Sequence, residues 1–356
     1  MATGMGSGGE GNGTPDRSGE SVQIRTLADL ARLAGVSTGT VSRALAGKSL
    51  VNAETRERIQ ALAREHGFRP NQMASKLRSK HTGVIGIVIP LGHEIRQHIS
   101  DPFFLTLLGC LADELTESGY DVMLSRAIPD GTSDWLERIT GSGMVDGVLL
   151  IGQSDQFEII ESVCEHYMPL VAWGAYREGQ IHCSVGTDNF AGGRLAAEHL
   201  IAAGATQLAY LGETKGIEIE ERCRGAAAAA AKAGVSLTHV PISLANDEMG
   251  QELNAAAFDC AHGIDGVIAA SDLIALNVLH CLHERERPVP GEVQVVGFDD
   301  LPMAALTMPS LTTIKQEITI GAKAMVEKLK ARIAGQQTES MTMVPRLIVR
   351  ESTKAV

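Results

Sequence analysis

Near the start of the chain, the spacing of apolar positions predicts two short helices joined by a tight turn. Apolar side chains recur at helical spacing in two stretches, namely Leu27, Leu30, Ala31 and Ala34, and then Val41, Ala44 and Leu45. Thr26 and Ser37 precede these stretches as helix caps, because a hydroxyl accepts a hydrogen bond from a free backbone N–H. Gly35 ends the first helix, since glycine adopts the left-handed conformation at little cost. Residues 26–45 therefore have a helix-turn-helix pattern.

From residue 82 onward, short apolar runs alternate with amphipathic stretches of helical period. The predicted strands are Val84–Ile89, Val122–Ser125, Gly147–Ile151, Leu170–Trp173, Leu208–Leu211, Gly266–Ala270 and Val293–Phe298. The helical stretches include Phe103–Ser118, Gly192–Ala203, Glu220–Ala233 and Leu273–His283. Wholly apolar strands that alternate with helices are typical of parallel sheets buried on both faces. The pattern predicts two α/β lobes in tandem, with strand ends facing a cleft, where such sheets bind ligands.

A third helix is predicted over 52–66, capped by Asn52, and it completes a small N-terminal bundle. Such a bundle can exist without any DNA role, but the charge distribution favours one. Residues 21–80 carry eleven basic and four acidic side chains, in a chain of net charge −12. A basic head on an acidic body is typical of a DNA-binding module attached to a domain that avoids DNA.

Other sequence features exclude several classes of protein. Residues 1–22 are rich in glycine and serine and cannot bury a core, so we expect a disordered tail without the pattern of a signal peptide. No segment reaches the roughly 18 apolar residues that span a membrane. The six cysteines are scattered without a Cys-x-x-Cys spacing, which favours reduced thiols in a cytoplasmic protein. No ligand spacing recurs among cysteines and histidines, so no metal site is expected.

Several ordered motifs give the chain a close resemblance to the LacI/GalR family of bacterial repressors. They are Thr-Leu-Ala-Asp-Leu-Ala-Arg-Leu-Ala-Gly-Val-Ser at 26–37, Thr-Val-Ser-Arg-Ala-Leu at 40–45, Asp188-Asn189, Ser271-Asp272, Val296–Asp300 and Leu311–Ile314. The resemblance covers roughly residues 23–352. It implies an all-α helix-turn-helix headpiece followed by an α/β periplasmic-binding-protein-like domain of two lobes with chain crossovers. The implied domains are a tail at 1–22, a headpiece at 23–68, a hinge helix at 69–81 and an effector-binding and dimerisation domain at 82–356.

The resemblance assigns DNA contacts to the second helix and the hinge. The implied DNA-binding residues are Thr26, Ser37, Thr38, Gly39, Thr40, Ser42, Arg43, Asn52, Asn71, Ala74 and Leu77. An arginine can donate two hydrogen bonds to one guanine, worth about 1–3 kcal/mol of discrimination, although Arg43 can alternatively contact a phosphate. Leu77, flanked by cations, matches the family's minor-groove wedge. Gly39 departs from members with a long polar side chain there, so DNA shape is expected to share in recognition.

Candidate effector contacts lie just past the ends of predicted strands. Arg222 and Asp299 match the effector-binding arginine and aspartate of the family, and both residue types suit sugar hydroxyls. Further candidates are Asp101, Phe103, Trp173, Ser271 and Asp272. Trp173 can instead be a structural core residue, and Asp272 can instead be a helix cap. Ala245 stands where some family members carry a pocket aromatic.

The favoured function is a transcriptional repressor that binds a near-palindromic operator in double-stranded DNA as a homodimer. A small-molecule effector, expected to be a mono- or disaccharide, would switch it by a population shift. A purine or nucleoside corepressor and a sugar-binding protein without a DNA role are the alternatives. An enzyme is not favoured, because the phosphate-loop, dinucleotide and nucleophile-elbow motifs are all missing. No cofactor is expected.

Overall fold

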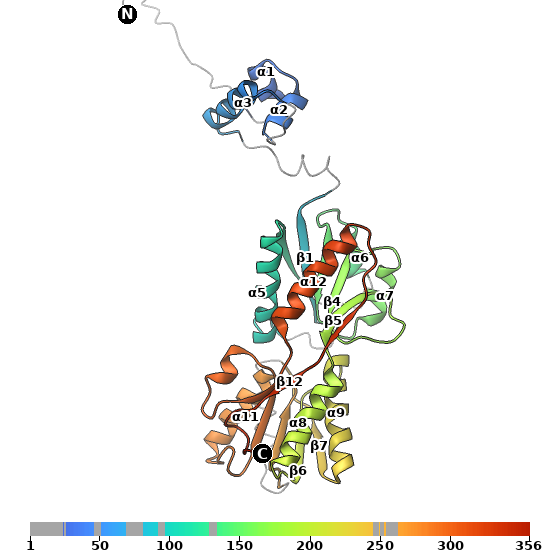
Figure 1. Cartoon of the computed structure of the whole chain (residues 1–356), viewed down its shortest axis with the longest axis vertical. Coiled ribbons are helices and arrows are strands. Elements are labelled where there is room, and N and C mark those ends of the chain that lie inside the picture. Colours follow the sequence, from blue (N-terminus) through green and yellow to red (C-terminus); the bar gives the residue numbers. More distant parts are fainter. Residues whose placement is uncertain are drawn as a thin grey trace, which may run out of the picture. The chain divides into compact units, whose positions relative to one another are not determined.

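The computed structural model describes residues 24, 26–45, 51–68, 81–91, 97–127, 134–244, 249, 253 and 263–356. The chain divides into two compact units, Met1–Lys80 and His81–Val356 (Figure 1). The expected tail at 1–22 and the hinge residues 69–80 lie outside the described residues. Each unit is therefore described by itself.

The small unit contains three helices, α1 (Leu27–Ala34), α2 (Thr38–Leu45) and α3 (Ala53–Glu65). Each predicted cap forms, because Thr26 accepts from the N–H of Asp29, Ser37 from that of Thr40 and Asn52 from that of Thr55. Gly35 ends α1 in the left-handed conformation, as predicted. Side chains from all three helices form one core, made of Ile24, Leu30, Ala31, Ala34, Val41, Ala44, Val51, Ile59, Ala63 and Phe68.

The first lobe of the large unit is built on a six-stranded parallel sheet. Its strand order is β11-β5-β4-β3-β1-β2. The strands are β1 (Val84–Pro90), β2 (Asp121–Ala127), β3 (Gly147–Ile151), β4 (Leu170–Trp173), β5 (Cys183–Thr187) and β11 (Met341–Met343). The helices are α5 (Pro102–Glu117), α6 (Trp135–Thr140), α7 (Phe157–Cys164) and α12 (Ile318–Ile333).

Alternating side chains of this sheet face two separate cores. Ile85, Ile87 and Ile89 of β1 pack with α5 and α12, whereas Val88 packs with α6 and α7. Because both faces are covered by helices, the central strands are apolar at every position. This is the physical reason that continuous apolar runs predicted these strands.

The second lobe repeats the architecture, with strand order β12-β10-β9-β8-β6-β7. The strands are β6 (Gln207–Leu211), β7 (Ser236–Val240), β8 (Gly266–Ala269), β9 (Gln294–Asp299), β10 (Thr312–Lys315) and β12 (Arg346–Ile348). The helices are α8 (Asn189–Ala202), α9 (Ile217–Ala233), α11 (Asp272–Glu284) and the short 3₁₀ helix η2 (Pro302–Ala305). Strand β12 pairs with β10 in the antiparallel direction, so this sheet is not wholly parallel as the sequence pattern suggested.

Three connections join the lobes. They run from β5 to α8, from β10 to α12 and from β11 to β12, as the element order and the two strand orders show (Figure 1). Helix α12 packs against α5, β3 and β4, so it returns the chain to the first lobe. The expected repeated crossing between lobes is therefore present.

Two glycines allow the backbones of α8 and α9 to touch. A Cβ atom at Gly193 of α8 would overlap with the carbonyl oxygen of Arg222 in α9, and one at Gly225 would overlap with that of Phe190. No side chain can fit between backbones at this separation. The contact holds the helix segment that carries Arg222.

Replacement of Gly193 by alanine should destabilise the protein by about 1–3 kcal/mol, because the added methyl forces α8 and α9 apart. Thermal unfolding of the full chain measures this effect. Gly109→Ala is the matched control, since Gly109 lies in α5 and a Cβ atom added there would have no neighbouring atom within 4 Å. The control should be neutral or more stable by up to about 1 kcal/mol. Equal melting temperatures for the two variants would contradict the close contact.

Candidate functional site

The predicted base-reading residues lie on one outward side of the small unit. Thr38 and Arg43 of α2 are exposed, whereas Val41 and Ala44 on its other side are buried. The other candidates in this unit, Thr26, Ser37, Gly39, Thr40, Ser42 and Asn52, are exposed or half-buried. Asn71, Ala74 and Leu77 lie outside the described residues.

Gly39 leaves the side chain of Arg43 uncovered. A Cβ atom at Gly39 would lie 3.8 Å from Nη2 of Arg43, which is ordinary van der Waals contact. Position 39 therefore tolerates a side chain sterically, and glycine is not required by packing. Because position 39 has no side chain, the guanidinium of Arg43 is the longest polar group on this part of α2.

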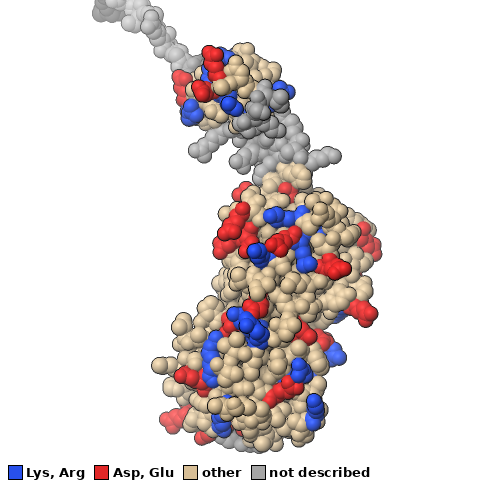
Figure 2. Space-filling view, in the orientation of Figure 1, with Lys and Arg blue, Asp and Glu red and all other residues tan. Residues whose placement is uncertain are grey.

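The described part of the small unit carries five basic side chains beside all four acidic ones of residues 21–80. Of the eleven basic residues in 21–80, the described ones are Arg32, Arg43, Arg56, Arg58 and Arg64. On the large unit, acidic and basic side chains are interspersed over the visible face (Figure 2). Such a mixed surface does not favour the phosphate backbone of DNA.

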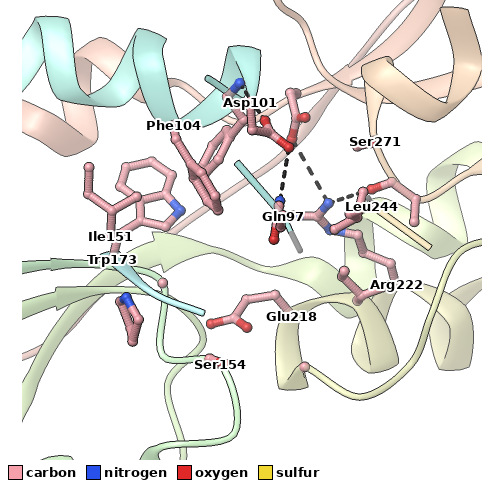
Figure 3. Close-up of a pocket in the computed structure, with 17 residues that line it drawn as sticks. Gln97, Asp101, Phe104, Ile151, Ser154, Trp173, Glu218, Arg222, Leu244 and Ser271 are labelled. Carbon is pink, nitrogen blue, oxygen red and sulfur yellow. Dashed lines mark hydrogen bonds and ion pairs between the residues drawn. The ribbon is translucent and has the colours of Figure 1, made fainter. Parts of the chain in front are cut away.

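A cleft lies between the two lobes of the large unit. It is lined by Pro90, Gln97, Asp101, Phe103, Phe104, Ile151, Gly152, Ser154, Trp173, Gly216, Glu218, Ile219, Arg222, Leu244, Ala270, Ser271 and Asp299 (Figure 3). Its walls come from the carboxyl ends of strands in both sheets, as the strand-end rule for open α/β folds predicts. The structure brings six of the seven predicted effector residues to this one cleft, and Asp272 is the exception.

Arg222 is buried, and two of its nitrogen atoms donate hydrogen bonds within the protein. Its Nε donates to Oδ1 of Asn189 at 2.8 Å, and its Nη1 donates to the carbonyl oxygen of Ala270 at 2.6 Å. The guanidinium stacks on Phe298, with Cζ 3.7 Å from the ring centroid. Nη1 also lies 3.9 Å from Oδ1 of Asp299, which makes an ion pair. These contacts hold the guanidinium rigidly at the cleft wall.

Asp299, the last residue of β9, has an unusual backbone and environment. Its φ is +121°, and Asp300 follows with a φ of +56°. Such values are rare outside glycine, and they turn the chain sharply at the cleft edge. Burial raises the pKa of the Asp299 carboxyl to about 7, while the neighbouring Arg222 opposes this effect. Nε2 of Gln316 donates to its Oδ1 at 2.6 Å.

Arg222 and Asp299 are joined through the connections between the lobes. Asn189 accepts from Arg222 and donates to the carbonyl oxygen of Thr187 at 2.9 Å. The hydroxyl of Thr187 donates to the carbonyl oxygen of Gln316 at 3.0 Å, and Gln316 donates to Asp299. With the ion pair, these residues form a closed ring of contacts that includes the β5–α8 and β10–α12 connections. The ring therefore links the cleft wall to two of the segments that join the lobes.

Aromatic side chains form an apolar wall on the first lobe. The ring of Phe103 contacts that of Trp173 edge to face, with the ring centroids 5.9 Å apart. It also contacts the ring of Phe104, with the centroids 6.0 Å apart. Trp173 is 3% exposed, and its ring packs against Gly321 of α12. Trp173 is therefore a core residue that also lines the cleft, and its contact with a ligand stays a prediction. An apolar wall opposite polar groups suits the two faces of a pyranose ring.

Asp101 caps α5 at the cleft. Its Oδ1 accepts from the N–H of Phe103 at 2.9 Å, and its Oδ2 accepts from Nε2 of Gln97 at 2.9 Å. Burial raises the pKa of Asp101 above its usual value, and these hydrogen bonds oppose the shift. Oε1 of Gln97 is buried and has no hydrogen-bond partner within the described part of the chain. A buried unpaired acceptor in a cleft is suited to a ligand hydroxyl.

Asp272 does not reach the cleft, which corrects the expectation that it contacts a ligand. It is fully buried, and its oxygens accept from the N–H of Leu301 at 2.8 Å and the hydroxyl of Thr313 at 2.5 Å. Burial raises its pKa well above the usual range. It is not the cap of α11 either, because Ser271 accepts from the N–H of Ile274 at 3.3 Å. Asp272 instead ties β10 and the segment after β9 to α11.

Sequence reasoning missed several residues of the site. Ser154 follows β3, so the strand-end rule was sufficient to predict it. Asn189 belongs to the Asp188-Asn189 motif, but only the fold shows that it holds Arg222. Glu218 and Gln316 carry no sequence signal, since each is a polar residue next to a helix start.

Three further features concern the described residues alone. Within them, no group of three or more His, Cys, Asp or Glu side chains is placed to hold a metal ion. The described cysteines, Cys110, Cys164, Cys183, Cys223 and Cys281, are free thiols. A search of the same residues finds no helix both long and apolar enough to cross a membrane.

Comparison with known families matches both units. Residues 26–71 match the model of bacterial regulatory proteins of the lacI family, and residues 197–353 match that of a periplasmic binding protein-like domain. These matches cover the three-helix unit and most of the second lobe.

Individual relatives match over nearly the whole chain. The ribose operon repressor of Halalkalibacterium halodurans is 30% identical over 338 residues, which cover 93% of this chain and 98% of that protein. The structure of a transcriptional regulator CelR–cellobiose complex is 28% identical, with a TM-score of 0.63, and covers 92% of this chain and 100% of that one. The lac repressor dimer bound to operator and the anti-inducer ONPF shares the fold, with 24% identity and a TM-score of 0.78 over 93% of this chain and 99% of that one.

Proposed function

Because the chain belongs to the LacI family of bacterial regulatory proteins, we propose that it is a sequence-specific transcriptional repressor controlled by a sugar. The three-helix unit binds an operator, and the cleft between the lobes binds the effector. The relatives support both halves of the proposal, since one is named a ribose operon repressor and another holds cellobiose. The chain would act in the cytoplasm, where the chromosome lies, and would catalyse no reaction.

The closed ring of contacts from Arg222 to Asp299 is the observation that carries the proposal. It connects the cleft wall to two of the three connections between lobes. A ligand hydroxyl that bonds to Asp299 or Arg222 competes with these internal contacts. The ligand thereby favours one arrangement of the lobes over another, which is the differential affinity that any allosteric switch requires.

The partners follow from the same scheme. A homodimer would place two copies of α2 on the two halves of a near-palindromic operator. The hinge helix at 69–81, with Asn71, Ala74 and Leu77, remains a prediction. In this scheme the hinge would couple effector binding to DNA binding. No cofactor beyond the effector is required.

Operator release by sugars tests the proposed function. Fluorescence anisotropy on DNA from the promoter next to the gene should show sequence-specific binding that ribose, cellobiose or a related sugar changes. Purines and nucleosides serve as the competing effector class. Absence of specific DNA binding, with and without these compounds, would refute the repressor, whereas a response to purines alone would refute the sugar.

Effector affinity should rise with pH around neutrality. The pKa of Asp299 is raised by burial to about 7, so its carboxyl is mostly protonated at pH 6 and mostly ionised at pH 8. The ionised form is the better acceptor for sugar hydroxyls, so affinity should increase up to about tenfold between these values. Calorimetric titration at several pH values measures the change. Asp299→Asn should bind more weakly with a flat profile, and an unchanged pH dependence in this variant would contradict the assignment.

A further inference from the structure

The charges around the cleft are unbalanced. Among its described lining residues, the carboxyl groups belong to Asp101, Glu218 and Asp299, and the one cationic group belongs to Arg222. Burial raises the pKa of each of the three carboxyls, although the charges of Arg222 and Arg177 oppose this shift at Glu218. Another negative charge would meet carboxylates in a partly desolvated space, where like charges repel strongly.

Arg222 offers an anionic ligand only part of its donor capacity. Its Nε and Nη1 already donate to Asn189 and to the carbonyl oxygen of Ala270, and its charge is paired with Asp299. Binding of a phosphate through the planar fork would require these contacts to break. A neutral hydroxyl group requires no such rearrangement, because it can donate to a carboxylate and accept from an N–H of the guanidinium that is not already engaged.

Glu218 differs from the other two carboxylates in its internal contacts. Asp101 is bonded to the start of α5 and to Gln97, and Asp299 to Gln316 and Arg222. The carboxyl of Glu218 accepts only from backbone groups: its Oε1 accepts from the N–H of Ala175 at 3.3 Å, and the carboxyl also accepts from the N–H of Glu218 itself. A carboxylate has about four acceptor sites, so about half of its capacity remains for a ligand.

Glu218 forms a hydrogen bond between the two lobes. It lies in the first turn of α9 in the second lobe, whereas Ala175 follows β4 in the first lobe. Gly174 makes this approach possible, because a Cβ atom there would lie 2.5 Å from Oε1 of Glu218. Figure 3 draws Asp101 above and Glu218 below the pocket, with Arg222 at its flank.

We propose that the cleft selects uncharged, hydroxyl-rich ligands over their anionic derivatives, and that Glu218 is the residue that sets this preference. The inference rests on the proposed function, since it takes the effector to be a sugar, and it narrows that class to unphosphorylated sugars. The effector would then come from transport or hydrolysis reactions that leave the sugar without a phosphate group.

Paired ligands test the charge preference. The probes are ribose with ribose 5-phosphate, glucose with glucose 6-phosphate, and cellobiose with cellobiose 6-phosphate, each titrated calorimetrically into the full chain. The neutral member should bind at least about tenfold more tightly than its phosphate. Glu218→Gln keeps the size and the acceptor for Ala175, and it should reduce this ratio by about tenfold.

Two further variants separate charge from folding. Glu220→Gln removes the same charge from an exposed position in α9, and Glu218→Asp keeps the charge, so both should retain the preference. A phosphate that binds as tightly as its parent sugar would overturn the proposal, and so would an unchanged ratio in Glu218→Gln. Operator release is measured separately. A sugar that binds without changing the affinity for operator DNA would refute the regulatory function and leave the charge preference intact.

Discussion

A protein in which lysine replaces Arg222 should stay on its operator at effector concentrations that release the unaltered protein. The guanidinium bonds to Asn189 and Ala270 and stacks on Phe298 at the same time. A lysine ammonium keeps the charge beside Asp299, but it cannot reproduce the planar fork or the stacking. Effector affinity should fall by about 2–4 kcal/mol, while operator affinity without effector should remain.

Anisotropy of labelled operator during effector titration measures this loss. Arg224→Lys is the matched control, because Arg224 lies on the same helix, is exposed and pairs with Glu221 outside the cleft. A melting temperature near that of the unaltered protein shows that the Arg222 variant is folded. If this variant is released from the operator at the same effector concentration as the unaltered protein, then Arg222 is not part of the effector site.

Replacement of Arg43 by alanine should sharply reduce discrimination between operator and random DNA. The side chain is exposed on α2, and Gly39 leaves it uncovered, so it is free to enter a major groove. A bidentate contact with guanine is worth about 1–3 kcal/mol in each half-site, and a homodimer loses it twice. Folding should be preserved, because the residue is not part of the headpiece core.

The affinity ratio between operator and random DNA is the decisive measurement. Arg43→Lys keeps the positive charge without the fork, so it should bind random DNA normally and lose most of the preference for operator. If the alanine variant loses affinity equally for both DNAs, then Arg43 contacts a phosphate, and operator selection lies elsewhere.

The pattern of apolar residues predicted most elements within a few residues. All seven predicted strands are present within two residues of their expected ends, and the four named helices within three. Strands β5, β7, β10, β11 and β12 were not predicted, because they carry polar residues such as Ser184, Thr238 and Thr312. Pairing with neighbouring strands, rather than their own hydrophobicity, makes these segments extended.

The candidate site was predictable where a residue follows a buried strand. Asp299 and Trp173 end strands, so the strand-end rule placed them at the cleft. The same rule failed for Asp272, which directly follows the capping residue Ser271 but turns inward to Leu301 and Thr313. The direction of a side chain at a helix start depends on the loops packed against it, and no local pattern contains that information.

The sequence by itself determined the helix-turn-helix, the two α/β lobes and the presence of an arginine and an aspartate suited to sugar hydroxyls. These features depend on local periodicity, caps and residue type, which are properties of short segments. The tertiary structure alone decided that Arg222 and Asp299 share a ring of contacts with Asn189, Thr187 and Gln316, and that Glu218 bonds across the lobes. Such contacts join residues far apart in the chain, so they exist only once the three connections between the lobes are in place.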